Sequence, residues 1–331
     1  MMRVALVTTG GTIVSLIDPA TGRAMPVLDG ERLLDGLRGR SDAAGIDAAA
    51  IEVHDLMCVA SPQIGLDDWV ALHRRVQQLV ARDDIGAVIV THGTSTLEET
   101  AWFLDLTVRT DKPIVLTGAQ RNASEADFDG PRNLIGAIRV GQADAARGLG
   151  VLVVLNDHVN AAREVTKTHT LDVETFSSGE WGFLGAVQRH RVVFHRAPLR
   201  RLHIPLHDAV LPLVDVVAMY PGATGALVGA AIDHGAQGVV IAAVASGHVN
   251  AAMAAAIERV LAAGTPVVVS TRIPRGGTRE GYGFDGASSR LVEAGAVLSD
   301  DLSPWKARIL LMLALQAGLA QRDPLSALFR G

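Results

Sequence analysis

The sequence predicts an α/β protein of two domains, an N-terminal domain built on a parallel, flavodoxin-like sheet and a smaller α/β C-terminal domain. Three observations lead to this prediction. The chain has 331 residues, about twice the usual size of a domain. Short apolar, β-branched runs alternate with amphipathic helical patterns, which indicates a parallel sheet covered by helices on both faces. Glycine is frequent, with 34 residues, which suits tight turns between strands and helices.

The expected elements of the N-terminal domain follow from local patterns. Buried strands are expected at four apolar runs: Val4–Val7, Val88–Val90, Ile114–Leu116 and Val151–Leu155. Residues 67–82 place their apolar side chains on one helical face, with Asp67 as the expected N-cap. Thr96 and Glu99 have the spacing of a capping box, which predicts a second helix through Leu106. Pro131 suits the first turn of a third helix.

Residues 195–212 interrupt this alternation, because they are rich in Arg, His and Pro and have no clean period. We expect them to form a linker between an N-terminal domain at 1–194 and a C-terminal domain at 213–331. A second β/α series follows the linker. Its expected strands are Val214–Val217, Val239–Val244 and Val267–Ser270, and its expected helices lie near 223–234, near 250–263 and from Ser303 to about Ala317.

Composition excludes several classes of partner. The net charge is −5 and no basic stripe is interleaved with aromatic residues, so we expect no nucleic-acid partner. No apolar run approaches the ~20 residues of a membrane span, so we expect no membrane partner. The run Val4–Val7 is too short for the core of a signal peptide, which predicts a cytoplasmic protein. The lone Cys58 allows no intrachain disulfide. Neither nucleotide-binding glycine motifs nor metal-ligand spacings occur, so we expect no cofactor and no metal.

Polar clusters follow several of the predicted strands. They lie at 9–12, 91–96, 156–157 with 165–168, and 246–248. In open α/β sheets, ligands bind beyond the carboxyl ends of the strands, where such clusters would lie. Spacing alone leaves a structural interpretation open, in which these residues turn the chain, cap helices or lie on the surface. A threonine such as Thr12 would need an activating base to act as a nucleophile.

Three segments, Thr8–Ile13, Thr91–Thr94 and Leu97–Leu104, resemble the two signature segments of the bacterial type I/II L-asparaginases. The spacing from Ser61 to Trp69 also matches that family. The resemblance covers essentially the whole chain, with a weaker C-terminal third. It continues through Lys112–Gln120, Asp129–Leu134 and Val165–Thr168.

The resemblance implies an amidohydrolase that converts the carboxamide of L-asparagine, or of a related small amide, to a carboxylate and ammonia. By that resemblance, Thr12 attacks the amide carbonyl and forms an acyl-enzyme. Thr94 and Lys167 form a second polar pair that orients water or activates the nucleophile, and Ser61 binds the substrate carboxylate. A homodimer or homotetramer is also implied, since a neighbouring subunit completes each active site in this family. The chemistry is consistent, because a desolvated lysine has a lowered pKa and can accept a proton.

The sequence departs from the family at positions that contact the substrate. Pro62 stands in place of a glutamine, Ser95 in place of an aspartate, and His248 within a segment that is usually Gly-Asn-Gly-Asn. Met25 stands where the tyrosine of the active-site loop is expected. The acidic residue contributed by a neighbouring subunit aligns near Gly283, with Glu280 and Tyr282 close by.

Pro62, Ser95 and His248 supply no permanent negative charge to a substrate ammonium. We therefore expect a substrate that keeps the carboxamide but lacks a free α-ammonium, carries it substituted, or is larger. The alternative is that Glu280 or another carboxylate restores ordinary asparaginase activity.

Two other functions fit the same fold. One is a small-molecule binding or sensing protein that has lost efficient catalysis, suggested by the altered substrate contacts. The other is the amide-donor subunit of a tRNA amidotransferase. Such subunits usually carry an extra N-terminal domain, whereas this chain opens directly on its first predicted strand.

Overall fold

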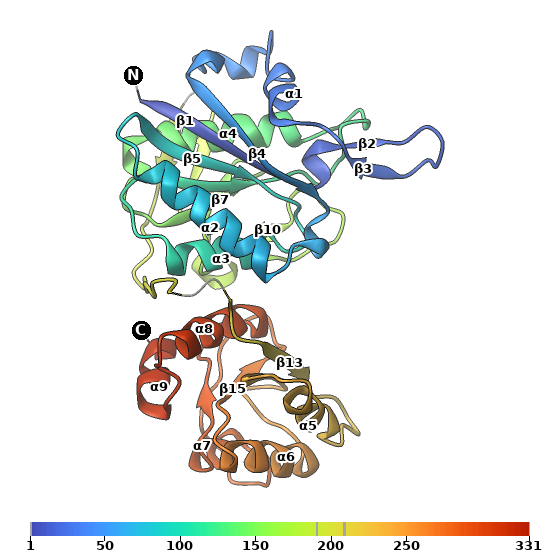
Figure 1. Cartoon of the computed structure of the whole chain (residues 1–331), viewed down its shortest axis with the longest axis vertical. Coiled ribbons are helices and arrows are strands. Elements are labelled where there is room, and N and C mark those ends of the chain that lie inside the picture. The colour runs from blue at the N-terminus through green and yellow to red at the C-terminus, as the bar shows by residue number, and fades with distance from the viewer. Residues whose placement is uncertain (1, 190, 208–209, 331) are drawn as a thin grey trace. The chain divides into compact units, whose positions relative to one another are not determined.

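The computed structural model describes residues 2–189, 191–207 and 210–330. The chain divides into two compact units that meet between His203 and Ile204. Each unit is built from a sheet and helices, so the predicted two-domain α/β class is confirmed (Figure 1). The linker expected at 195–212 spans this division, and its residues 208–209 lie outside the described residues. Its limits stay a prediction.

An eight-stranded sheet forms the centre of the N-terminal unit, in the order β12-β11-β8-β7-β6-β5-β1-β4. The strands are β1 Arg3–Gly10, β4 Ile51–Val59, β5 Ile85–Thr91, β6 Ile114–Thr117, β7 Val151–Leu155, β8 His158–Ala161, β11 Gly185–Gln188 and β12 Arg191–Phe194. From β4 to β7 the neighbouring strands run parallel. Of these, β1, β5, β6 and β7 contain the four runs predicted as buried parallel strands, whereas β4 was not predicted. The remaining pairs are antiparallel, so the sheet as a whole is mixed.

The sheet changes direction at the two-residue turn between β7 and β8. Asn156 and Asp157 form this turn, with φ angles of 48° and 64°. Asn and Asp adopt this left-handed conformation more readily than most residues, and two-residue turns of this kind join antiparallel strands. The parallel sheet predicted from the apolar runs is therefore extended by a hairpin that those runs did not indicate.

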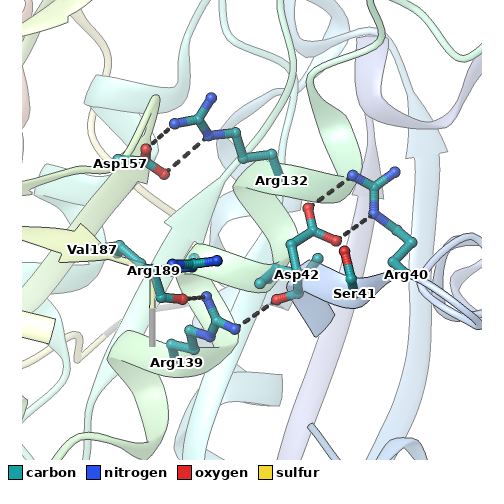
Figure 2. A pocket seen from close by; sticks show the side chains of 10 residues that line it. Arg40, Ser41, Asp42, Arg132, Arg139, Asp157, Val187 and Arg189 are labelled. Carbon is teal, nitrogen blue, oxygen red and sulfur yellow. Dashed lines mark hydrogen bonds and ion pairs between the residues drawn. The ribbon is translucent and has the colours of Figure 1, made fainter. Parts of the chain in front are cut away.

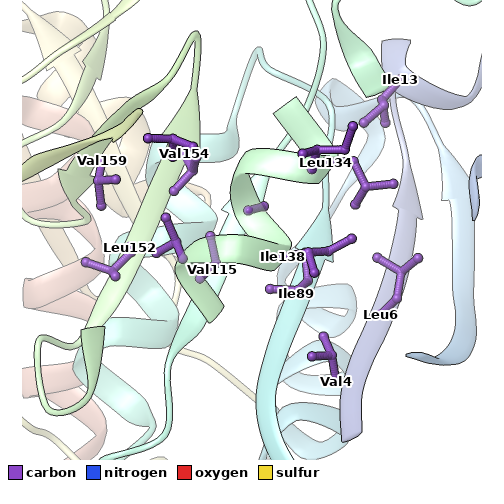
Figure 3. Packing of buried hydrophobic residues seen from close by; sticks show 14 of the residues in the cluster. Val4, Leu6, Ile13, Ile89, Val115, Leu134, Ile138, Leu152, Val154 and Val159 are labelled. Atoms are coloured by element: carbon purple, nitrogen blue, oxygen red, sulfur yellow. The ribbon is translucent and has the colours of Figure 1, made fainter. Parts of the chain in front are cut away.

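Helices cover both faces of this sheet. They are α1 Gly30–Asp35, α2 Leu66–Val80, α3 Leu97–Thr107 and α4 Gly130–Gln142. Alternate strand residues such as Leu6 and Ile89 point toward α4, where they pack with Leu134 and Ile138 in one apolar cluster (Figure 3). Helices α2 and α3 contact each other and the central strands. The Trp69 and Phe103 rings stack between them at a centroid distance of 5.1 Å.

Two predicted helix starts differ from the structure. The N-cap of helix α2 lies two residues earlier than expected, at Gly65 instead of Asp67, and the N–H of Gly65 donates to the carboxylate of Asp68 at 2.9 Å. Thr96 does precede α3, but its hydroxyl donates to the Ser61 carbonyl at 3.0 Å instead of capping the helix. A long-range contact thus replaces the local capping box. Pro131 does lie in the first turn of α4.

The C-terminal unit is a four-stranded parallel sheet in the order β13-β14-β15-β16. Its strands are β13 Val214–Ala218, β14 Gly238–Ala243, β15 Val267–Thr271 and β16 Val297–Leu298. Its helices are α5 Ala226–Asp233, α6 Ala251–Ala262, α7 Ser288–Glu293, α8 Pro304–Gln316 and α9 Arg322–Arg330. The side chains of Asn250 and Ser303 cap α6 and α8 by accepting backbone N–H groups of the first turn.

Short elements complete the N-terminal unit. Two small antiparallel pairs and six 3₁₀ turns are present in the described residues of the chain. The pairs are β2 Ser15–Ile17 with β3 Ala24–Pro26, and β9 Thr166–Lys167 with β10 Phe176–Ser177. The 3₁₀ turns are η1 Thr12–Val14, η2 Ser41–Ala43, η3 Ala48–Ala50, η4 Ser61–Gln63, η5 Asp144–Ala146 and η6 Gly179–Trp181. Of the helices in the described ranges, none has the length and apolarity to cross a membrane.

The central position of Leu6 predicts a large loss of stability on truncation. Leu6 is 0% exposed, whereas Leu199 is 97% exposed. We expect Leu6→Ala to lower the free energy of unfolding by roughly 2–5 kcal/mol, because it leaves a cavity in the core. Leu199→Ala should change it by less than about 0.5 kcal/mol. Urea unfolding followed by circular dichroism checks both variants, and equal shifts of the midpoint would contradict this description of the core.

Candidate active site

Two glycine-containing loops meet at the carboxyl edge of the N-terminal sheet. Gly10 ends β1 and Gly11 follows it, with φ angles of 108° and 83°. A Cβ on Gly11 would lie 2.3 Å from the Cα of Gly93, in the loop after β5. A Cβ on Gly10 would lie 2.2 Å from the carbonyl oxygen of Val59. Both positions therefore require glycine, for conformation and for space.

This backbone contact brings the predicted nucleophile toward the second signature segment. Thr12 follows Gly11 directly and begins the 3₁₀ turn η1, and it is half-buried. Thr94 follows Gly93 directly and is buried. Because the two glycines touch, the two threonines start from adjacent points of the backbone. The sequence placed them after different strands, and the neighbouring positions of β1 and β5 in the sheet bring those loops together.

Thr94, Lys167 and Gln120 form a closed hydrogen-bonded group. The Nζ of Lys167 donates to the Oγ1 of Thr94 at 2.8 Å and to the Oε1 of Gln120 at 3.0 Å. The Oγ1 of Thr94 also donates to the Oε1 of Gln120, at 2.8 Å. Both lone pairs of the amide oxygen are thus engaged. The Nε2 of Gln120 donates to the Asp172 carbonyl at 3.0 Å, which turns the oxygen of the amide toward the lysine.

Burial lowers the pKa of Lys167 below its usual value of 10.5, and the nearby carboxylate of Glu98 opposes this by raising it. Glu98 is itself buried, and its Oε2 accepts the backbone N–H of Lys167 at 2.7 Å. Lys167 lies on the two-residue strand β9, so this bond and the pairing with Phe176 in β10 fix its backbone. The neutral amide of Gln120 accepts from the ammonium without adding a negative charge that would raise its pKa further.

A buried chain of neutral groups supports the loop that carries Gly93. The Nδ1 of His92 lies 2.8 Å from the Gly93 carbonyl, which can only accept, so Nδ1 carries the proton. The Nε2 then accepts from the Thr100 hydroxyl at 2.9 Å, and that hydroxyl accepts from the Nε1 of Trp69 at 2.9 Å. Burial lowers the pKa of His92 to about 4, so the ring is neutral near pH 7.

Ser61 lies against the same glycine. A Cβ on Gly93 would lie 2.7 Å from its Oγ, so the serine hydroxyl is directly beside the loop. Ser61 begins η4 and is buried. Pro62 and Ser95, which stand at two of the altered substrate positions, are exposed. The structure thus brings Ser61 to the loop that carries Gly93 and Thr94, and leaves Pro62 and Ser95 at the surface of the N-terminal unit.

The other predicted contacts belong to the C-terminal unit. His248 follows β14 and is buried, and the backbone N–H of Ser288 donates to its Nδ1 at 3.2 Å. Its Nε2 therefore carries the proton of a neutral ring and faces the Oγ of Ser246 at 3.2 Å. The exposed ring of Tyr282 contacts the imidazole at a centroid distance of 5.1 Å, and Glu280 is exposed in the same loop.

Sequence reasoning missed two residues of this arrangement. Gln120 and Glu98 both lie in segments that carry the resemblance, but the pattern assigns neither a contact with Lys167. A signal for Gln120 was present, since it lies three residues beyond the end of β6, at the same sheet edge as Thr12 and Thr94. Met25 lies in β3, where it pairs with Leu16 and is exposed.

The residues that the structure describes contain no group of three or more His, Cys, Asp or Glu side chains arranged to hold a metal ion. The polar groups of the site are instead hydroxyls, an amine, an amide and backbone dipoles. Such a set can bind a small polar molecule and transfer protons between a hydroxyl and an amine.

Comparison with known proteins relates this geometry to a family. Residues 3–200 match the family described as Asparaginase, N-terminal, and residues 213–329 match the Glutaminase/Asparaginase C-terminal domain. L-asparaginase 2 of Bacillus subtilis is 35% identical over 321 residues, covering 94% of this chain and 82% of that protein. L-asparaginase 2 of Escherichia coli is 34% identical over 319 residues, covering 94% and 88%.

Solved structures agree. The crystal structure of a probable cytoplasmic L-asparaginase from Campylobacter jejuni aligns with a TM-score of 0.88 at 31% identity, over 100% of this chain and 99% of that one. Both domains of the family are present in the expected order. The chain therefore belongs to the L-asparaginase family, and it is an amidohydrolase of the asparaginase/glutaminase type.

Proposed function

We propose that this enzyme hydrolyses the side-chain carboxamide of L-asparagine or a related small amide, with Thr12 as the nucleophile. The observation that carries the proposal is the Thr94–Lys167–Gln120 group, which gives a partly desolvated amine beside the loop contact that holds Thr12. The Oγ1 of Thr12 would attack the amide carbon and release ammonia, leaving an ester on the threonine. Water would then cleave the ester and regenerate the hydroxyl.

Thr94 and Lys167 would handle the proton in both steps. The neutral form of Lys167 accepts a proton, and the hydrogen-bonded hydroxyl of Thr94 can pass one between the amine and the attacking oxygen. We assign stabilisation of the developing oxyanion to backbone N–H groups at the start of α3 and in the turn after β1. The N–H of Gly11 already donates to the Val59 carbonyl at 2.9 Å, so the proposal uses N–H groups that follow it. Ser61 would bind the substrate carboxylate.

We further propose a homodimer or homotetramer and a cytoplasmic location. The Campylobacter jejuni relative is described as probably cytoplasmic, whereas a Haemophilus influenzae relative, 34% identical, is described as probably periplasmic. The match to the Campylobacter jejuni protein over 100% of this chain supports the cytoplasmic proposal.

Removing the nucleophile or the amine should abolish turnover without unfolding the protein. We expect Thr12→Ala and Lys167→Ala each to lower kcat for amide hydrolysis by roughly 10³-fold or more, because each removes a group needed in the chemical step. The exposed Thr224 of the C-terminal unit provides a matched control, and Thr224→Ala should retain full activity. Ammonia release measures turnover and circular dichroism checks folding. Full activity in both Thr12→Ala and Lys167→Ala would exclude these roles.

The pKa of Lys167 should set the rise of activity with pH. If the neutral amine is the base, kcat/KM increases as pH passes through this pKa, which lies below 10.5. Glu98→Gln keeps an oxygen that accepts the Lys167 N–H but removes the charge that raises the pKa. The pKa of Lys167 should then fall, and the rise in kcat/KM should move to lower pH.

Glu31→Gln is the control for this pH profile, since Glu31 also lies in the first turn of a helix but is exposed on α1. Glu31→Gln should leave the pH at which kcat/KM rises unchanged. A shift to higher pH in Glu98→Gln, or equal shifts in the two variants, would show that Lys167 is not the titrating base.

The altered substrate positions predict an unusual preference among amides. Pro62 and Ser95 carry no charge, and the neutral His248 presents an N–H donor from Nε2, which cannot accept from an ammonium. Losing charged partners should weaken the interaction with a free α-ammonium by roughly ten- to several-hundred-fold. We therefore expect succinamic acid and N-substituted asparagines to equal or exceed L-asparagine in kcat/KM.

Steady-state kinetics on these three substrates tests the preference. An advantage of two decades or more for L-asparagine would refute it. Glu280→Gln then identifies the cause, because loss of that advantage in the variant would assign the missing carboxylate to Glu280.

A further inference from the structure

A cavity of ≈ 470 Å³ lies on the N-terminal unit, apart from the residues of the proposed active site (Figure 2). Four arginines and two aspartates line it: Arg40, Arg132, Arg139, Arg189, Asp42 and Asp157. They come from four separate segments, namely η2 with the residue before it, helix α4, the turn after β7, and the turn between β11 and β12. Its volume is in the usual range for small-molecule sites.

Each of the two carboxylates forms an ion pair with one arginine. Arg40 donates to both oxygens of Asp42 at 2.8 and 2.9 Å. Arg132 donates to Asp157 from Nε at 3.2 Å and, more closely, from Nη2. Within the described part of the chain, neither Arg139 nor Arg189 forms an ion pair with a carboxylate. Four guanidinium groups and two carboxylates leave a local charge of +2, although the protein as a whole carries −5.

Arg139 is held in place by neutral groups. It donates from Nη1 to the carbonyl of Arg189 and from Nη2 to the carbonyl of Asp42 at 2.6 Å. A guanidinium has five N–H donors, so about three remain for another partner. Arg189 adopts a φ of 38°, a left-handed conformation that is unfavourable for a side chain of this kind. This conformation accompanies the contact between its carbonyl and Arg139.

Helix α4 supplies two of the arginines at a spacing that suits a site. Arg132 and Arg139 are seven residues apart, about two helical turns, so they project from the same face. Between them, Ile135 and the facing Val187 of β11 are buried and line the cavity with apolar surface. A guanidinium next to apolar surface interacts with an anion more strongly than one surrounded by water.

We propose that this cavity is a second binding site, for a small molecule that carries at least two negative charges on oxygen atoms. Phosphate esters and di- or tricarboxylates share this chemistry, and the planar fork of arginine binds both through paired hydrogen bonds. Arg139 and Arg189 would make the main contacts, because the two carboxylates of the cavity form their ion pairs with Arg40 and Arg132 instead. Arg40 and Arg132 would also contact the ligand while they remain paired with Asp42 and Asp157.

Isothermal titration of the whole enzyme with inorganic pyrophosphate and with citrate, at constant ionic strength, tests this proposal. We expect saturable binding of at least one of the two, weakened by added salt, and no binding of acetate, which has a single carboxylate. Tighter binding of pyrophosphate would identify a phosphate ligand, and tighter binding of citrate a carboxylate ligand. Absence of saturable binding by both anions would overturn the proposal.

Variants locate the binding. Arg139→Gln and Arg189→Gln should each weaken it by about tenfold, equivalent to about 1.4 kcal/mol. Arg259→Gln is the matched control, because Arg259 lies in the last turn of α6, as Arg139 does in α4. It should bind like the unaltered protein. Equal weakening in Arg259→Gln, or unchanged binding in both cavity variants, would show that anions associate with the surface at large. Unchanged midpoints of thermal unfolding confirm that the variants are folded.

Discussion

The contact between the backbones of Gly11 and Gly93 is the constraint on which the N-terminal site depends. No residue with a Cβ fits at Gly11, because that atom would lie 2.3 Å from the Cα of Gly93. This contact has three consequences. It sets the distance between the loops after β1 and β5, it places Thr12 and Thr94 at the start of their diverging segments, and it leaves room for Ser61 beside Gly93. Thr12, the predicted nucleophile, and Thr94 are therefore positioned by a contact between main-chain atoms.

The interior around this contact is polar but uncharged. His92 is neutral, and its two ring nitrogens are both bonded, one to the Gly93 carbonyl and the other to Thr100. A charged ring in the same place would have required a buried counter-ion. Glu98 lies close to Lys167, but its carboxylate accepts the backbone N–H of the lysine. The amine faces hydroxyl and amide groups, so burial dominates its pKa.

Much of the fold could be predicted from the sequence, because apolar strands and capped helices are local patterns. The parallel strands β1, β5, β6 and β7 lie where β-branched runs occur. The antiparallel extension could not be predicted in that way. Its strands are four residues long, and the turn at Asn156 and Asp157 has no glycine to mark it. Thr96 shows the same limit, since its hydroxyl bonds to Ser61, a residue 35 positions away, instead of to its own helix.

Sequence motifs predicted some residues of the site. Contacts that form only in the tertiary structure could not be predicted from them. Thr94 and Lys167 were expected to form a pair, and the structure places them 2.8 Å apart. The place of Gln120 after β6 indicated the sheet edge, but the contacts of Gln120 and Glu98 with Lys167 could not be predicted, because these residues lie 47 and 69 positions from Lys167 in the sequence. His248 lies in the C-terminal unit, where its neighbours Tyr282 and Phe284 come from a loop more than thirty residues later.

The turn after β7 has an evolutionary consequence. The N–H of Asn156 donates to the Oδ1 of Asn133, and Asn133 donates from Nδ2 to Asp129, whose carboxylate accepts the N–H of Gln120. Residues that share partners in this way show interaction free energies of about 0.5–3 kcal/mol, so the effect of one substitution depends on the others. Sequence drift along this stretch is therefore expected to be epistatic. Because Gln120 and Asn156 take part through their backbone N–H groups, the coupling lies between Asp129 and Asn133, and a lineage that replaces one of these two residues is expected to replace the other as well if it is to keep the backbone of Gln120 in place.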